Sequence, residues 1–194
     1  MRVTILALIA FATPAALSAA PVADLCLDLD PARGGCEQVA LERAAADGGD
    51  LDLVIRAQTG EELARADGIA WGGPMDGQAP ELQRNEAGSL VLLTENTGVG
   101  RYGWNQSLTI AFRDGAYLVV GYDYGVFDRI SGSTMSCSWN LRTGRQELKY
   151  ELAEDGKPTK SGAPVTKKAE RVAIGDWDAR YGSGRPAFCN AGDF

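Results

Sequence analysis

Apolar and polar residues alternate most clearly in the middle of the chain, where the pattern predicts a β-hairpin. Leu108, Ile110 and Phe112 share one face of a first strand, and residues 116–122 return as a second apolar run. Arg113-Asp114-Gly115 separates the two runs. An Asp-Gly pair between alternating apolar runs is a strong short-range hairpin signal. We therefore expect two antiparallel strands here.

The rest of the chain carries shorter patterns of the same kind. They predict strands at residues 51–55, 69–71, 89–94, 135–141 and 146–152. Residues 37–46 fit either a short helix or a strand. Two stretches are rich in Gly, Pro or charged residues, which predicts loops: residues 59–88, around the strand at 69–71, and residues 157–168. A short helix is expected after Gly175, with Asp176 as its N-cap.

Short strands, close turns and little helix define the expected fold class. The pattern predicts an all-β protein of antiparallel sheets. Two arrangements fit: a propeller-like one and a compact β-sandwich.

The first 19 residues have the features of a secretory signal peptide. Arg2 provides a positive start, residues 3–17 are almost wholly apolar, and small residues follow. A charged start, a short apolar core and a small-residue exit are typical of cleavable signals. We expect residues 20–194 to form one β-rich, disulfide-bonded domain in the periplasm or outside the cell, with no membrane span.

The cysteines support an oxidising compartment. The four, Cys26, Cys36, Cys137 and Cys189, form an even set, which in an exported chain argues for disulfides. Four cysteines allow three pairings. We favour Cys26–Cys36, which closes a local loop, and Cys137–Cys189, which ties the C-terminal part to the body. A zinc site is disfavoured because the chain has no histidine and no C-x-x-C spacing.

Charge and the missing histidine narrow the function classes. Without histidine, Ser-His-Asp and Cys-His catalysis are excluded. Removing residues 1–19 removes one basic residue of 19 and none of the 26 acidic ones, which leaves a net charge of 18 − 26 = −8. This charge disfavours nucleic acid and favours cationic partners or simple solubility. We predict no cofactor, no resident metal and no enzymatic activity.

The segment from Tyr122 to Ser136 is the first candidate for partner binding. We interpret it as a loop that follows the hairpin and is anchored at Cys137, and aromatic and short polar side chains on such a loop suit protein recognition. Its candidate residues are Tyr122, Asp123, Tyr124, Asp128, Arg129, Ser131 and Ser133. The alternative is that Tyr122 and Tyr124 pack on the sheet. Arg101 and Tyr102, with Trp104, form a second candidate patch, whereas Trp71 and Trp139 are expected in the core.

Two other kinds of chemistry stay open. The acidic turns at residues 28–35 and 47–52 have some features of calcium loops, although neither has the full alternating aspartate pattern. The chain also has enough carboxylates for a two-carboxylate glycan hydrolase. A calcium-stabilised structural module of the envelope and a glycan hydrolase are therefore the alternatives to a binding protein.

Five segments together resemble a known group of proteins. The segments are 88–91, 103–110, 112–115, 118–124 and 140–145. Their order resembles exported bacterial β-propeller-like proteins, mostly uncharacterised, some of which are similar to periplasmic inhibitors of invertebrate-type lysozyme. The stretches at Asp28 and Asp50 are similar to degraded forms of the aspartate–glycine loops of related proteins.

This resemblance implies a function without catalytic residues. A member of this group would present a loop to a protein partner in a bacterial periplasm. The expected partner is a cationic, lysozyme-like cell-wall hydrolase, and an immunity-type role is the related expectation. A chain with a charge of −8 would be steered towards such a partner, and salt would weaken association.

Overall fold

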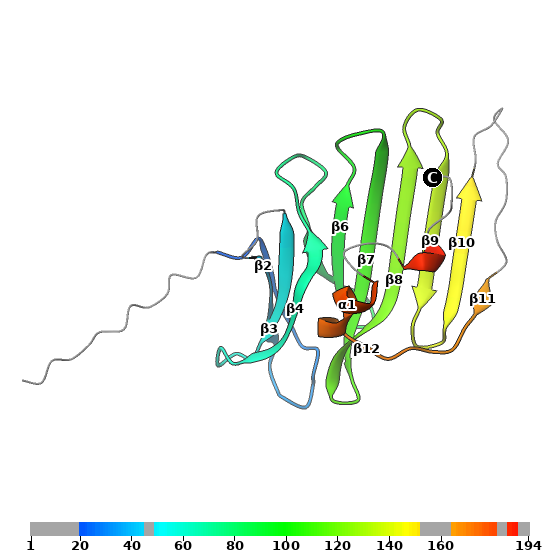
Figure 1. Cartoon of the computed structure of the whole chain (residues 1–194). Helices are drawn as coiled ribbons and strands as arrows, with labels where there is room; N and C mark the ends of the chain where they lie inside the picture. Colours follow the sequence, from blue (N-terminus) through cyan, green and yellow to red (C-terminus); the bar gives the residue numbers. More distant parts are fainter. Residues whose placement is uncertain (1–19, 45–48, 152–163, 182–185, 190–194) are drawn as a thin grey trace, which may run out of the picture.

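The computed structural model describes residues 20–44, 49–151, 164–181 and 186–189. Strands make up 55% and helix 7% of it, so the predicted all-β class of antiparallel sheets with little helix is confirmed. The strands form two sheets (Figure 1). The predicted signal peptide lies outside the described residues, and no helix within them is long and apolar enough to cross a membrane.

The smaller sheet comes from the first part of the chain. Its strands follow one another in order: β1 (Ala23–Leu27), β2 (Glu37–Arg43), β3 (Asp50–Arg56) and β4 (Glu62–Trp71). The segment around residue 40 is therefore a strand and not a helix, because Val39 and Leu41 alternate into the core. β4 is much longer than the predicted strand at 69–71, since a bulge opposite β3 lets the pairing continue across Gly68.

The larger sheet holds the remaining strands. They run in the order β11-β10-β9-β8-β7-β6-β5, and β12 pairs with the free end of β8. Their bounds are β5 Glu81–Arg84, β6 Leu90–Asn96, β7 Tyr102–Arg113, β8 Ala116–Asp128, β9 Thr134–Asn140, β10 Arg145–Glu151, β11 Val165–Thr166 and β12 Val172–Ala173. Residues 164–168 thus include a short edge strand where a loop was expected, and residues 157–163 lie outside the described part.

β7 and β8 form the predicted hairpin and are the longest strands of the sheet. Asp114 and Gly115 occupy the turn with φ of 51° and 75°, the left-handed conformation that a two-residue hairpin turn needs. An irregularity leaves Val120 unpaired with β7. There the other edge of β8 changes its partner from β9 to β12. The bulge therefore lets one long strand take part in two pairings.

The core lies between the sheets and under the C-terminal segment. A 3₁₀ turn, η1 (Ile174–Asp176), leads into α1 (Trp177–Tyr181), so a short helix follows Asp176 as predicted. α1 lies against one face of the larger sheet (Figure 1), where the Trp177 ring stacks on Tyr122 at 5.6 Å between centroids. We call this the inner face of the larger sheet and the opposite one its outer face.

A buried carboxylate links the two sheets. Glu37, at the start of β2, accepts hydrogen bonds from the backbone N–H groups of Leu29 and Asp30 at 2.8 and 3.1 Å. It also accepts one from the Tyr117 hydroxyl of β8 at 3.2 Å. Burial and the nearby Glu37 raise the pKa of Tyr117, so this phenol stays protonated and donates. The contact fixes the β1–β2 connection against the central hairpin.

Both favoured disulfides are present. Cys26 pairs with Cys36, and Cys137 of β9 pairs with Cys189, which ends the 3₁₀ turn η2 (Ala187–Cys189). The second disulfide holds the C-terminal segment on the inner face, where Trp139 meets Tyr181 and Phe188 edge-on. Trp139 is core, as expected, whereas Trp71 is only half-buried.

Candidate functional site

The predicted loop from Tyr122 to Ser136 does not exist as a loop. β8 continues to Asp128 and β9 begins at Thr134, so only residues 129–133 form a turn. Tyr122 and Tyr124 point into the core, with exposures of 0% and 8%, and the alternative that they pack on the sheet is correct. Asp123, between them, lies exposed on the outer face. The prediction failed because short polar residues and Gly125 among the aromatic side chains were interpreted as a loop, whereas they continue strand β8.

The other candidate residues come together at one end of the larger sheet. Arg101 and Tyr102 lie where β7 begins, and Asp128, Arg129, Ser131 and Ser133 lie where β8 ends and turns into β9. The backbone N–H of Arg129 donates to the carbonyl of Arg101 at 3.1 Å, so the two segments are directly joined. We call residues 72–80, 97–101 and 129–133, with Tyr102, the loop end.

An ion pair organises the loop end from beneath. The Arg101 guanidinium forms an ion pair with the Asp128 carboxylate, and its Nε donates to both carboxylate oxygens at 3.0 Å. Asp128 is only 5% exposed, and it also accepts a hydrogen bond from the backbone N–H of Ile130 at 2.9 Å. Together, the Arg101 guanidinium, the Ile130 N–H and the Ser131 hydroxyl hold the pKa of Asp128 well below its usual range. Asp128 is therefore a structural anion of the turn and not an exposed contact residue.

Arg129 fixes the neighbouring loop. Its guanidinium donates to the carbonyls of Thr97, Val99 and Gly100 and lies over the ring of Phe127, 5.0 Å from its centroid. The turn itself is closed by Ser131, whose hydroxyl meets that of Ser133 at 2.9 Å. These contacts hold residues 97–100 and 129–133 in one arrangement.

A third loop belongs to the same end. The backbone N–H of Thr97 donates to the carbonyl of Gly77 at 2.8 Å. A side chain at Gly98 would meet the carbonyl of Asp76, so glycine is required for this close approach. Gln78 is buried and donates to Asn96 at 3.0 Å. Three loops far apart in the sequence are thus cross-linked by hydrogen bonds.

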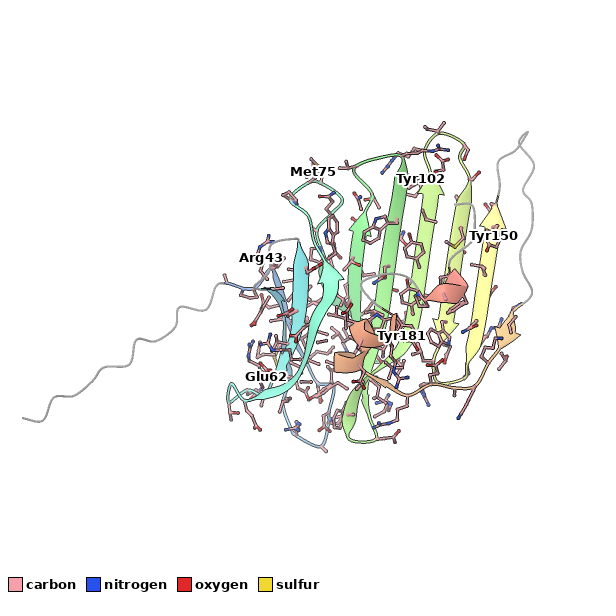
Figure 2. The ribbon with its side chains drawn as sticks, viewed as in Figure 1. Arg43, Glu62, Met75, Tyr102, Tyr150 and Tyr181 are labelled. Atoms are coloured by element: carbon pink, nitrogen blue, oxygen red, sulfur yellow. A yellow bond between two sulfur atoms is a disulfide. The ribbon has the colours of Figure 1, made fainter. Side chains whose placement is uncertain are left out.

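The outward surface of the loop end carries four exposed apolar side chains. Met75, Val99, Tyr102 and Ile130 are 54, 39, 42 and 76% exposed. Figure 2 shows Met75 and Tyr102 at the same end of the molecule. Among described residues only Val22 and Val165 are comparably exposed large apolar side chains, so this end holds the main apolar cluster. Sequence reasoning selected Tyr102 but missed the other three, which are isolated apolar residues in loops and give no pattern.

The acidic turns are occupied by contacts within the chain. Asp30 pairs with Arg33 at 3.2 Å, and Asp52 pairs with Arg65 at 3.2 Å and accepts from the N–H of Gly68. Residues 47 and 48 of the second turn lie outside the described part. In the described residues no three His, Cys, Asp or Glu side chains are grouped to hold a metal ion.

Comparison with known proteins gives no neighbour for this chain: no family model, no curated protein and no solved structure matches it.

Proposed function

We propose that this chain is a non-enzymatic binding protein of the cell envelope, in the periplasm or secreted, and that its loop end contacts a protein partner. One observation carries the proposal: three exposed apolar side chains on three mutually hydrogen-bonded loops, and a fourth, Tyr102, at the adjoining start of β7, lie at one end of the sheet. Aromatic and large aliphatic side chains anchor protein interfaces. A surface already held in place loses little freedom on binding, which favours affinity.

Charge suggests the kind of partner. The loop end together with Asp128 is close to neutral, because Arg101 and Arg129 are balanced by Asp76 and Asp128. The chain without residues 1–19 has a charge of −8 (18 basic and 26 acidic residues). Long-range attraction would steer a cationic protein to this molecule, and the apolar cluster would supply the contact. A cationic, lysozyme-like cell-wall hydrolase could be attracted and bound in this way, as could an effector neutralised by an immunity-type protein.

The arrangement of carboxylates supports a role without catalysis. Asp123 and Glu147 lie on the same face on either side of Ser138, so they form one candidate carboxylate pair for a hydrolase. A glycan hydrolase needs one carboxyl group that stays protonated near neutral pH. Lys149, with help from Arg145, instead lowers the pKa of Glu147. This carboxylate is thus a poor general acid.

Inhibition of lysozymes tests the proposal. The oxidised protein would be titrated against chicken-, goose- and invertebrate-type lysozymes at low and moderate salt. We expect inhibition of one type, weakened by salt. We expect Ile130→Asp to weaken it at least about tenfold, because a charge would enter the apolar contact.

Val165→Asp is the matched control. Val165 is 49% exposed but lies on the edge strand β11, away from the loop end, so this variant should inhibit like the wild type. Absence of inhibition of all three types at about micromolar concentration would remove the lysozyme assignment. Equal losses in both variants would show that the loop end is not the contact surface.

A further inference from the structure

The outer face of the larger sheet carries a polar groove that is separate from the loop end. It has a volume of about 370 Å³ and crosses strands β7 to β10. Two rows of cross-strand neighbours line it. One row is Asn105, Gly125, Ser136 and Lys149, and the other is Asp123, Ser138 and Glu147. The groove lies on the face opposite α1 and the disulfide-bonded C-terminal segment.

The residue types in the groove are unusual for the middle of a sheet. Glycine and short polar residues weaken strands, and threonine or branched residues would stabilise an exposed face better. Glycine inside a strand often marks a place where a ligand approaches the backbone. At Gly125, a Cβ atom would lie 2.8 Å from Oδ1 of Asn105, so the amide of Asn105 extends over the space that the glycine leaves. The sheet thus keeps a hollow at its centre.

The polar side chains of the groove are available to a ligand. Asn105, Asp123, Ser136 and Ser138 make no side-chain hydrogen bond with any residue that the structure describes, and all four are exposed. Glu147 and Lys149 form an ion pair of 2.9 Å at the β10 side. The groove therefore offers donors and acceptors in alternation, with one carboxylate, Asp123, that no described cation neutralises.

We infer that this groove binds an uncharged, hydroxyl-rich glycan chain. Neighbouring hydroxyl groups of a sugar can donate together to the two oxygens of Asp123, while Asn105 and the serines both donate and accept. The amide of Asn105, which lies over Gly125, would meet the sugar at the bottom of the groove. Because the contacts are short, polar and open to water, we expect weak binding, with a Kd of about 1 mM.

Other ligand classes fit the groove less well. An extended peptide that adds to a sheet needs free backbone groups at an edge, and β7, β8 and β9 each have hydrogen-bonded strands on both sides. Nucleic acid is disfavoured, since Asp123 and Glu147 would face its phosphates. An apolar ligand would find no large apolar side chain among the two rows of groove residues.

Titration followed by NMR tests the inference. The isotope-labelled, oxidised protein would be mixed with cellotetraose, chitotetraose or maltotetraose up to about 10 mM, well above the expected Kd. We expect at least one of them to shift resonances of residues in β7 to β10 that surround the groove. Gly125→Val and Ser138→Arg would each fill the groove and should weaken the binding about tenfold or more.

The controls separate this site from the loop end and from folding defects. Thr109→Val, on the same face but outside the groove, and Ile130→Asp should both bind the glycan like the wild type. Ser138→Arg changes an exposed side chain, so its melting temperature should stay near that of the wild type. No shifts with all three glycans, shifts that survive both groove-filling variants, or tighter binding of a neutral Gly-Ser peptide to the same residues would overturn the inference.

Discussion

At the scale of single residues, Asp128 decides the shape of the loop end. It combines a nearly buried carboxylate, a guanidinium partner and a hydrogen bond to the turn backbone. Arg101 remains half-exposed, so the pair lies at the border between core and solvent. The consequence is that the surface carrying Ile130 and Val99 depends on an anion that a partner would not touch.

This anion makes the protein sensitive to acid. The pKa of Asp128 is lower in the folded protein than in the unfolded chain, chiefly because of Arg101. Its contribution to stability is therefore complete above about pH 4 and is lost as the pH falls towards the folded pKa. We expect the melting temperature of Asp128→Asn to lie below that of the wild type at about pH 6, and the gap to narrow towards about pH 2.5.

Asp123→Asn is the control for this pH series. Asp123 is exposed on the outer face and makes no hydrogen bond or ion pair with a described residue. The melting temperature of Asp123→Asn should lie close to that of the wild type, because the substitution removes no contact with a described residue. If the difference in melting temperature between Asp128→Asn and the wild type is the same at about pH 6 and about pH 2.5, the structural role of the Asp128 carboxylate is contradicted.

At the scale of elements, the short helix α1 covers part of the inner face of the larger sheet. Trp177 is 2% exposed and its ring contacts Tyr122 and Tyr181, with centroid distances of 5.6 and 4.6 Å. Burial and the hydrogen bond to Glu170 raise the pKa of Tyr181 to about 12, which keeps its hydroxyl protonated. A five-residue helix has little stability of its own, so packing holds it in place.

Truncating the Trp177 side chain should lower the stability of the fold substantially. Trp177→Ala leaves a large cavity between α1 and the sheet, and we expect a loss of about 3–5 kcal/mol in the free energy of unfolding. Asp178→Ala, an exposed change in the same helix, should cost less than about 0.5 kcal/mol. Denaturant unfolding measures both. A loss below about 1 kcal/mol for Trp177→Ala would mean that α1 does not seal the core.

The elements also show how far the sequence alone could predict the fold. Alternation identified the central hairpin and the strands around Leu53, Leu92 and Leu148, because each has one buried face. It missed the end of β8, although Tyr122, Tyr124 and Val126 alternate there, since Asp123 and Gly125 between them look like a loop. Asp123 and Gly125 lie on the outer face of the sheet, and this position becomes evident only when the neighbouring strands are in place.

The candidate site was harder to predict than the strands. Arg101, Tyr102 and Arg129 were candidates for partner binding on two separate segments, and the structure places them at one end of the sheet, but Met75 was not selected. Met75 reaches this end because Thr97 donates to the carbonyl of Gly77 and Gln78 donates to Asn96, which joins segments about 20 residues apart in the sequence. A local pattern carries no information about such contacts, and the groove around Gly125 exists only after four strands are placed in register.

At the scale of the whole molecule, the two disulfides have different roles. Cys26 and Cys36 are 10 residues apart, and Cys26 is exposed. Cys137 and Cys189 are 52 residues apart, and their exposures are 2% and 0%. The Cys26–Cys36 disulfide closes the connection between β1 and β2. The second joins the C-terminal segment to the centre of the larger sheet and covers the inner face.

These differences predict an order of reduction and of stability loss. Loop-closure entropy assigns about 3 kcal/mol to the short loop and about 4 kcal/mol to the long one, and removal of two buried sulfurs adds a cavity in the second case. We therefore expect Cys137→Ala/Cys189→Ala to destabilise the protein more than Cys26→Ala/Cys36→Ala. Under native conditions a mild reductant should open Cys26–Cys36 first, because reagent reaches Cys26 without unfolding. Alkylation followed by mass spectrometry gives the order, and first opening of Cys137–Cys189 would show that the C-terminal segment leaves the sheet more readily than its packing indicates.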